Sequence, residues 1–104
     1  MLRILAIEDS NEQRLVLEGK LIAPWTTEVR SACERARQNL EGRELIVDLK
    51  NLTVISEQGE DLLAALMSEG VKFRCRGLFA KHVLRQVARR AEAQLEIPPD
   101  RRTR

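Results

Sequence analysis

The stretch ELIVDL, residues 44–49, is the feature that most constrains what this chain can fold into. A compact apolar run of strand length, without strict alternation, is typical of a central strand covered on both faces. Such a strand needs neighbouring strands on each side and helices packed over the sheet. The run therefore predicts an α/β domain.

Strand-like segments flank this run in both directions. The segments that read as strands are 2–7, 13–21 and 71–77, with a hairpin at 8–12 and a brief last strand at 95–97. The resulting order is β-β-α-β-α-β-α, with one more strand if the last is included. We predict an α/β fold with a small mixed sheet of four to five strands and helices packed as crossovers.

Apolar residues at helical spacing predict three helices between these strands. The first lies within 26–40, with Thr26 or Thr27 as N-cap and Gly42 as its end. The second begins near Gly59 and ends at Gly70. The third carries an apolar stripe that recurs every four residues, at Phe79, Val83, Val87 and Ala91. We expect one domain over residues 1–97 and a flexible basic tail at 98–104.

Composition excludes several classes of protein. With 43% hydrophobic and 33% charged residues, the chain resembles an ordinary globular domain, and no apolar run is long enough to span a bilayer. Acidic residues appear by Glu8, so we expect no signal peptide. The two cysteines are too few for a disulfide framework, which favours a cytoplasmic location and small core residues at Cys33 and Cys75.

Charge is unevenly distributed along the chain. Residues 1–70 hold 8 basic and 13 acidic side chains, whereas residues 71–104 hold 10 basic and 3 acidic ones. Lys81, Arg85 and Arg89 form a basic stripe on the last helix. No aromatic residues are interleaved with them to stack on bases, so we expect a solvated face and no specific binding of nucleic acid.

No catalytic or metal-binding constellation is recognisable. The single histidine, His82, has no nucleophile or orienting partner nearby in sequence, and a structural zinc site would lack ligands. The glycines are isolated and form no phosphate-binding loop. We therefore expect no enzyme activity, no cofactor and no metal.

The polar residues Ser56, Glu57 and Gln58 precede Gly59 at the predicted start of the second helix. A helix N-terminus has unpaired N–H groups and the positive end of the helix dipole. Ser56 suits the N-cap, and nearby carboxylates suit the first turn. Good capping alone can explain these residues, and a role in reading a partner is compatible with it.

Two family resemblances are carried by these segments. RILAIEDSNEQRLVLEG resembles the start of a response-regulator receiver domain, which implies that Glu8, Asp9 and a phospho-accepting Asp48 surround Mg²⁺. However, Gly19 interrupts the long helix that a receiver needs after its acidic pair. The chain is also too short for the further strand–helix pairs after Asp48.

RLVLEGKLIAPWTTEVRSACE and ELIVDLKNLTVISEQGEDLLAAL resemble the STAS domain of anti-sigma factor antagonists, over about residues 2–90. In phospho-regulated members of that family, the second serine before the glycine is the acceptor. That position is Gln58 here, with Glu57 and Ser56 before it, and Ile22 stands where many relatives have aspartate. The motif is therefore degenerate, and Ser56 is the alternative acceptor.

The STAS resemblance implies a non-catalytic regulatory module that binds a protein partner of the anti-sigma factor or switch-kinase type. We expect the partner-binding residues to be Lys20, Trp25, Thr26, Ser56, Glu57, Gln58 and Gly59. Regulation by phosphate at the usual position is not expected, because Gln58 has no hydroxyl. The alternatives are an accessory subunit of a membrane transporter, a receiver-like signalling domain, and a basic nucleic-acid-binding protein.

Overall fold

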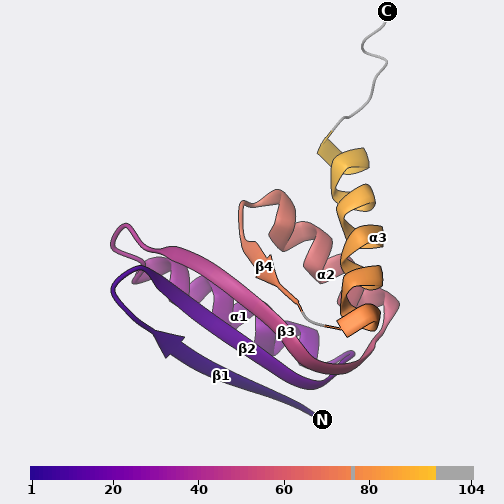
Figure 1. Ribbon diagram of the computed structural model, residues 1–104, viewed down its shortest axis with the longest axis horizontal. Helices are drawn as coiled ribbons and strands as arrows, with labels where there is room; N and C mark the ends of the chain where they lie inside the picture. The colour runs from indigo at the N-terminus through magenta and orange to yellow at the C-terminus, as the bar shows by residue number, and fades with distance from the viewer. Residues whose placement is uncertain (76, 96–104) are drawn as a thin grey trace, which may run out of the picture.

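The computed structural model describes residues 1–75 and 77–95 and contains one four-stranded mixed sheet with the strand order β1-β2-β3-β4 (Figure 1). The strands are β1 (Leu2–Glu8), β2 (Glu12–Leu21), β3 (Glu44–Ile55) and β4 (Lys72–Arg74). β1 runs antiparallel to β2, whereas β2, β3 and β4 are mutually parallel. The predicted fold class and element order are confirmed.

A tight hairpin joins β1 to β2. The Asp9 Oδ1 atom accepts hydrogen bonds from the backbone N–H groups of Asn11, at 2.8 Å, and Glu12, at 2.9 Å. These two bonds stabilise the carboxylate and lower the pKa of Asp9 below its ordinary value. Asp9 is therefore a turn residue that sets the register of the hairpin.

β2 does not end at Gly19 but continues to Leu21. Gly19 has φ +107°, and a Cβ atom there would lie 2.4 Å from the Met1 carbonyl oxygen. The pairing of β2 with β3 is irregular on both sides of this residue. A β-bulge at glycine thus lets β2 bend and extend to Leu21.

Three helices connect and extend the strands: α1 (Trp25–Gln38), α2 (Glu57–Ser68) and α3 (Gly77–Leu95). One aliphatic core joins them to a single face of the sheet. Its fully buried side chains include Leu17, Val29, Leu49, Leu63 and Val87. α3 contacts α2 more than it contacts the sheet, so α2 is its main packing partner.

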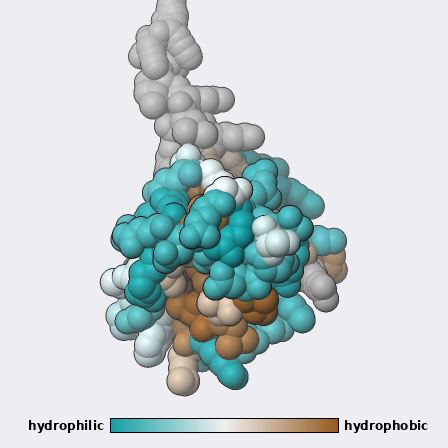
Figure 2. Space-filling model, turned by 90° about the vertical axis from the view of Figure 1, so that its left-hand side faces the viewer, coloured by the Kyte–Doolittle hydropathy of each residue, from teal (hydrophilic) through white to brown (hydrophobic). Residues whose placement is uncertain are grey.

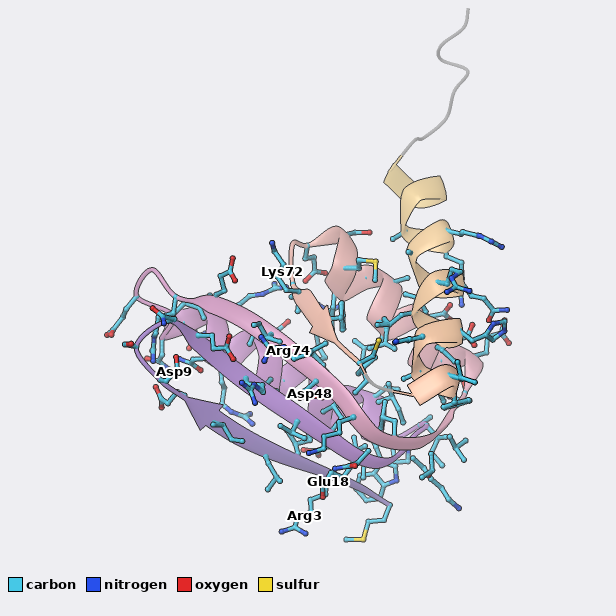
Figure 3. The ribbon with its side chains drawn as sticks, viewed as in Figure 1. Arg3, Asp9, Glu18, Asp48, Lys72 and Arg74 are labelled. Carbon is cyan, nitrogen blue, oxygen red and sulfur yellow. The ribbon has the colours of Figure 1, made fainter. Side chains whose placement is uncertain are left out.

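The two faces of β3 are covered differently. Leu45, Val47 and Leu49 point into the core beneath the helices. Ile46 and Asp48 point to the helix-free face, yet they are only 6% and 5% exposed. Figure 3 shows Asp48 on this face among charged side chains of neighbouring strands. The expectation of a strand buried on both faces is confirmed, but polar neighbours rather than helices cover the second face.

The ends of α1 differ from the prediction. The helix begins at Trp25 with Pro24 as its N-cap, rather than at Thr26 or Thr27. The Trp25 N–H bonds to Ile22 O at 2.8 Å, so the chain is already turning before the threonines. The helix ends at Gln38 because the Asn39 N–H bonds to Ala36 O, and Gly42 lies in the turn that follows.

Other boundaries also shift. β3 extends from the predicted 44–49 to Ile55, and β4 is shorter than the predicted 71–77. On α3 the buried stripe contains Ala80, Val83, Val87 and Ala91, whereas the predicted member Phe79 is 48% exposed. Leu95 lies in α3, and the rest of the predicted last strand and the 98–104 tail lie outside the described residues.

Candidate functional site

Parallel pairing brings three helix starts to one edge of the sheet. β2, β3 and β4 all end at this edge, and α1, α2 and α3 begin there (Figure 1). We call it the carboxyl edge, and the opposite end of these strands the amino edge. In open α/β sheets, binding sites are concentrated outside the carboxyl ends of the strands. Most of the predicted site residues lie at the carboxyl edge.

Ser56 caps α2, as predicted. Its Oγ atom accepts a hydrogen bond from the Gly59 N–H at 3.1 Å, and its carbonyl accepts one from the Glu60 N–H at 2.9 Å. β3 ends at Ile55 and α2 starts at Glu57, so the polar residues are the first turn of the helix and not a loop before it. The side chains at this point are therefore held by a formed helix.

The start of α2 is fastened to the end of β2. Leu21 O accepts hydrogen bonds from Ser56 N at 3.1 Å and from Ser56 Oγ at 3.4 Å. Gly59 is buried against the same carbonyl, and a Cβ atom at this position would lie 2.5 Å from Leu21 O. Only glycine fits this close approach of helix to strand. The junction fixes the height and direction of the first turn of α2.

The remaining predicted partner-binding residues surround this junction. Lys20 is exposed, Trp25 and Thr26 are half-buried at the start of α1, and Glu57 and Gln58 are exposed at the start of α2. The Trp25 ring also packs against the core, so it anchors α1 as well as presenting a surface. Lys20 pairs with Val54 of β3, which brings the end of β2 to the approach of α2.

Sequence reasoning missed three apolar residues at or near this edge. Val54 is 41% exposed, Leu78 is 87% exposed and Phe79 is 48% exposed. Val54 lies near the end of β3, and Leu78 and Phe79 are in the first turn of α3. The four-residue spacing of Phe79 from Val83 suggested a core residue, but Ala80 takes that role. Large exposed apolar side chains that gather at one end of a sheet are candidates for an interaction surface.

The acidic side chains of α2 fall into two groups. Arg90 of α3 contacts Glu60, with 3.0 Å between Nη1 and Oε1, and also contacts Asp61. Glu57 has no ion-pair partner among the described residues. Two of the three carboxylates near the start of α2 thus fasten α3 to α2, and only Glu57 remains free for another molecule.

The carboxylates that a receiver domain would use are held apart. Asp9 lies at the hairpin and Asp48 in the middle of the sheet (Figure 3). Glu8 binds Arg43, with 2.7 Å between Oε1 and Nη1, and Asp48 accepts a hydrogen bond from the Lys50 N–H. Across residues 1–75 and 77–95, no group of acidic, cysteine or histidine side chains is arranged to hold a metal ion. The magnesium cluster of the receiver interpretation is not formed.

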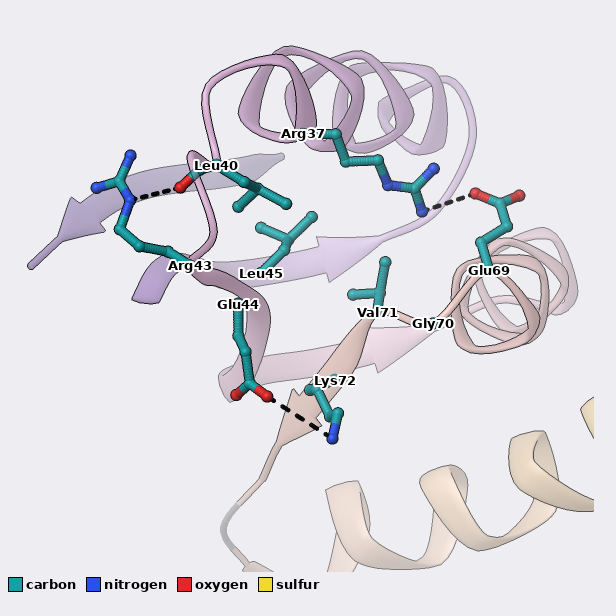
Figure 4. A pocket seen from close by; sticks show the side chains of 9 residues that line it. All are labelled: Arg37, Leu40, Arg43, Glu44, Leu45, Glu69, Gly70, Val71 and Lys72. Carbon is teal, nitrogen blue, oxygen red and sulfur yellow. Dashed lines mark hydrogen bonds and ion pairs between the residues drawn. The ribbon is translucent and has the colours of Figure 1, made fainter. Parts of the chain in front are cut away.

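A cavity of about 430 Å³ lies at the amino edge (Figure 4). Its cationic side chains are already paired. The Arg37 Nη2 atom lies 2.8 Å from Glu69 Oε1, Lys72 Nζ lies 3.9 Å from Glu44 Oε2, and Arg43 Nε donates to Leu40 O at 2.8 Å. Because these positive charges are compensated, the cavity is not suited to bind an anion. Its ion pairs instead connect the segments that meet at the amino edge.

In the part of the chain that the structure describes, the other titratable groups form no catalytic arrangement. Burial raises the pKa of the Cys33 thiol to about 11, so it is protonated and unreactive at neutral pH. His82 is exposed on α3, and Lys81, Arg85 and Arg89 form the expected solvent-facing stripe. The carboxyl edge is therefore a surface of fixed backbone, free polar groups and exposed apolar side chains.

In comparisons with known proteins, no family model matches this chain and no curated protein matches it. Among the described helices, none is long and apolar enough to cross a membrane.

Proposed function

We propose that this chain is a non-catalytic regulatory module that binds a protein partner through its carboxyl edge. The observation that carries the proposal is the junction at Gly59. It fixes a helix N-terminus with two exposed residues, Glu57 and Gln58. Their side chains make no hydrogen bond or ion pair with the other described residues. Exposed apolar residues at the same edge, including Phe79, supply the contact area that such polar groups lack.

The composition of this surface favours a protein over a small molecule. Protein interfaces combine apolar and aromatic contacts in the middle with polar groups at the rim. Trp25, Phe79 and Val54 provide the first kind of contact, and Lys20 and Glu57 provide the second. A rigid surface also reduces the entropy lost on binding, because its backbone is already ordered.

For the class of partner we rely on the STAS resemblance. It favours a cytoplasmic anti-sigma factor or switch kinase that would meet the first turn of α2. Gln58 at the usual acceptor position cannot accept phosphate. The alternative acceptor, Ser56, uses its hydroxyl to cap α2 and to bond Leu21 O. We therefore propose that partner affinity is constitutive and set by the abundance or state of the partner.

A binding titration tests this proposal. The partner would be an anti-sigma factor or switch kinase encoded beside the gene for this chain, and its Kd would be measured by calorimetry. We expect Gln58→Lys and Phe79→Ala each to weaken binding at least tenfold, about 1.4 kcal/mol. Gln38→Lys, an identical change at an exposed position where α1 ends, is the matched control and should leave Kd unchanged. Equal affinity in all three variants would contradict a site at the carboxyl edge.

The absence of a phosphate switch has its own test. The protein is incubated with the same kinase and ATP, and phosphate is located by mass spectrometry. We expect no stoichiometric modification of Ser56. A phosphate there would add about −1.5 to −2 charges at pH 7 and displace the hydroxyl from its cap. Full modification of Ser56 with a changed Kd would overturn the constitutive model.

A further inference from the structure

Among the described residues, β1 is an edge strand: β2 is its neighbour on one side and no strand pairs with its outer side. Two hydrogen bonds at the ends of the hairpin show which residues of the first strand face β2. Lys20 N–H donates to Met1 O, and Asp9 N–H donates to Glu12 O, so the odd-numbered residues of the first strand bond to β2. The register between the strands is continuous. In an antiparallel ladder, hydrogen-bonded pairs alternate. The N–H and C=O groups of Leu2, Ile4, Ala6 and Glu8 therefore point away from the sheet.

The outer edge of β1 lacks most of the devices that keep sheet edges apart, and its only charges, Arg3 and Glu8, lie near its two ends. Natural edge strands are commonly blunted by proline, by lysine, by a bulge or by a covering loop. Residues 2–8, LRILAIE, contain neither proline nor lysine, and their ladder with β2 has no bulge. The irregular pairing lies on the other side of β2, toward β3. The open edge is thus straight enough to accept another strand.

Apolar side chains accompany the open backbone on both faces. Ile7 on the helix-free face is 50% exposed. On the helix face a groove of about 530 Å³ runs between β1 and α1, with an apolar floor that includes Ile4, Ala6 and Ala32. Figure 2 shows hydrophobic side chains gathered in the lower part of that view, where β1 forms the margin of the molecule.

The charges of the groove are arranged with opposite signs at its two ends. Glu28 and Arg35 of α1 both line it, seven residues apart and thus about 10 Å along the helix. Neither has an ion-pair partner among the described residues. A surface with one acidic and one basic end is electrostatically complementary to its own copy turned by a two-fold rotation.

We propose that two copies of this chain pair through β1 as antiparallel neighbours, with the two-fold axis at Leu5. In this register Ile4 lies opposite Ala6 of the second copy, and Leu2 lies opposite its Glu8. These are the residues with free backbone groups, so every outward N–H and C=O from Leu2 to Glu8 gains a partner. The two sheets join into one, with their helices on the same side.

The side chains fit this register as well. Leu5 lies opposite Leu5 of the second copy on the helix-free face, and Ile7 lies opposite its Arg3, whose aliphatic stem can cover it. Like charges stay apart because the two Arg3 residues fall at opposite ends of the paired strands. The acidic end of one groove, at Glu28, lies toward the basic end of the other, at Arg35. These matches single out a second copy as the occupant.

Sedimentation over a range of protein concentrations tests the pairing. We expect the wild type to dimerise and Ala6→Pro to raise the dimer dissociation constant at least tenfold. Proline at this position removes an outward N–H and leaves the bonds to β2 intact. Ala6→Val is the matched control, since it keeps the N–H and a strand-forming side chain, and it should still dimerise. A monomeric wild type at several hundred micromolar, or a dimer unaffected by Ala6→Pro, overturns the proposal.

Cross-linking tests the register and does not depend on the proline variant. Facing residues of a non-hydrogen-bonded pair have Cα atoms about 4.5 Å apart, within disulfide range. In a Cys75→Ser background, Leu5→Cys should therefore form a disulfide-linked dimer under mild oxidation. Ile7→Cys should not, because its two copies lie about 13 Å apart in this register. Equal cross-linking of both variants, or of neither, contradicts the two-fold axis at Leu5.

Discussion

The two edges of the parallel strands use charged and apolar residues in opposite ways. At the amino edge, cations are satisfied within the chain: Glu69 lies between Arg30 and Arg37, and Arg43 bonds Glu8. At the carboxyl edge, Glu57 and Gln58 are exposed and unbonded among the described residues, and apolar side chains remain in solvent. The difference separates an edge that closes the fold from an edge that is available to a partner.

A substitution at the junction of α2 with β2 should have the largest effect on stability. Gly59→Ala places a Cβ atom 2.5 Å from Leu21 O, a backbone atom that cannot rotate away. Overpacking of this kind costs about 1–3 kcal/mol, although alanine is intrinsically the better helix former by about 1 kcal/mol. We expect a net loss of stability in urea denaturation. A variant as stable as the wild type would show that α2 is free to move from β2.

The cap of α2 should have the next largest effect. Ser56→Ala removes the oxygen that accepts the Gly59 N–H, and loss of an N-cap costs about 1 kcal/mol. Ser56→Asp supplies a new acceptor and should recover most of that stability. Thermal denaturation of the three proteins measures both effects. If the alanine and aspartate variants have equal stability, the cap does not hold the first turn in place.

The amino edge provides a smaller effect that depends on pH. Burial works to raise the pKa of Glu69, but hydrogen bonds and charge from Arg37 and Arg30 outweigh it and hold the pKa below its ordinary 4.5. A lowered pKa in the folded state means that the stabilisation is present above pH 4.5 and is lost as pH falls through the folded pKa.

Glu69→Gln removes this contribution. We expect the unfolding free energy of the wild type to exceed that of Glu69→Gln by less than about 1 kcal/mol near neutral pH, since exposed ion pairs contribute little. The difference should shrink as pH falls below 4.5 and the wild-type carboxylate becomes protonated. Parallel curves of stability against pH for the two proteins would contradict the role of Glu69 as a charged bridge.

The smallest effect on stability is expected where the effect on binding should be large. Gln58→Ala and Phe79→Ser change exposed side chains with no buried partner, so each should alter the unfolding free energy by no more than about 0.5 kcal/mol. Urea titration of both variants checks this. A larger loss would mean that the carboxyl edge maintains the fold and is less independent of it than its exposure indicates.

Much of the architecture is readable from local patterns. The apolar run at 44–49, the helical spacing at 62–67 and the serine before α2 each depend on nearby residues alone, and each is confirmed. Boundaries that depend on backbone detail were missed. Pro24 starts α1 through a turn that begins at Ile22, and Asn39 ends it before Gly42.

The spatial relations of the site could not be predicted from the residues. The hydrogen bond between Ser56 and Leu21 O joins positions 35 residues apart, and no local sequence pattern predicts it. The same holds for Arg90, which pairs with two acidic residues of α2. The exposure of Phe79 was misjudged because Ala80, a weaker hydrophobic signal, takes the buried position beside it. The STAS resemblance placed residues 20–26 and 56–59 in one set of partner-binding residues, and the partner itself is a prediction.

The close approach of Gly59 to Leu21 has a consequence for how such a protein can diverge during evolution. Position 59 admits only glycine, so the scaffold at this point is fixed for as long as β2 and α2 stay in contact. The exposed positions 57 and 58, immediately before it, carry no such constraint. Duplicated copies of the gene can therefore acquire new binding preferences by drift at these two sites without first gaining stability elsewhere.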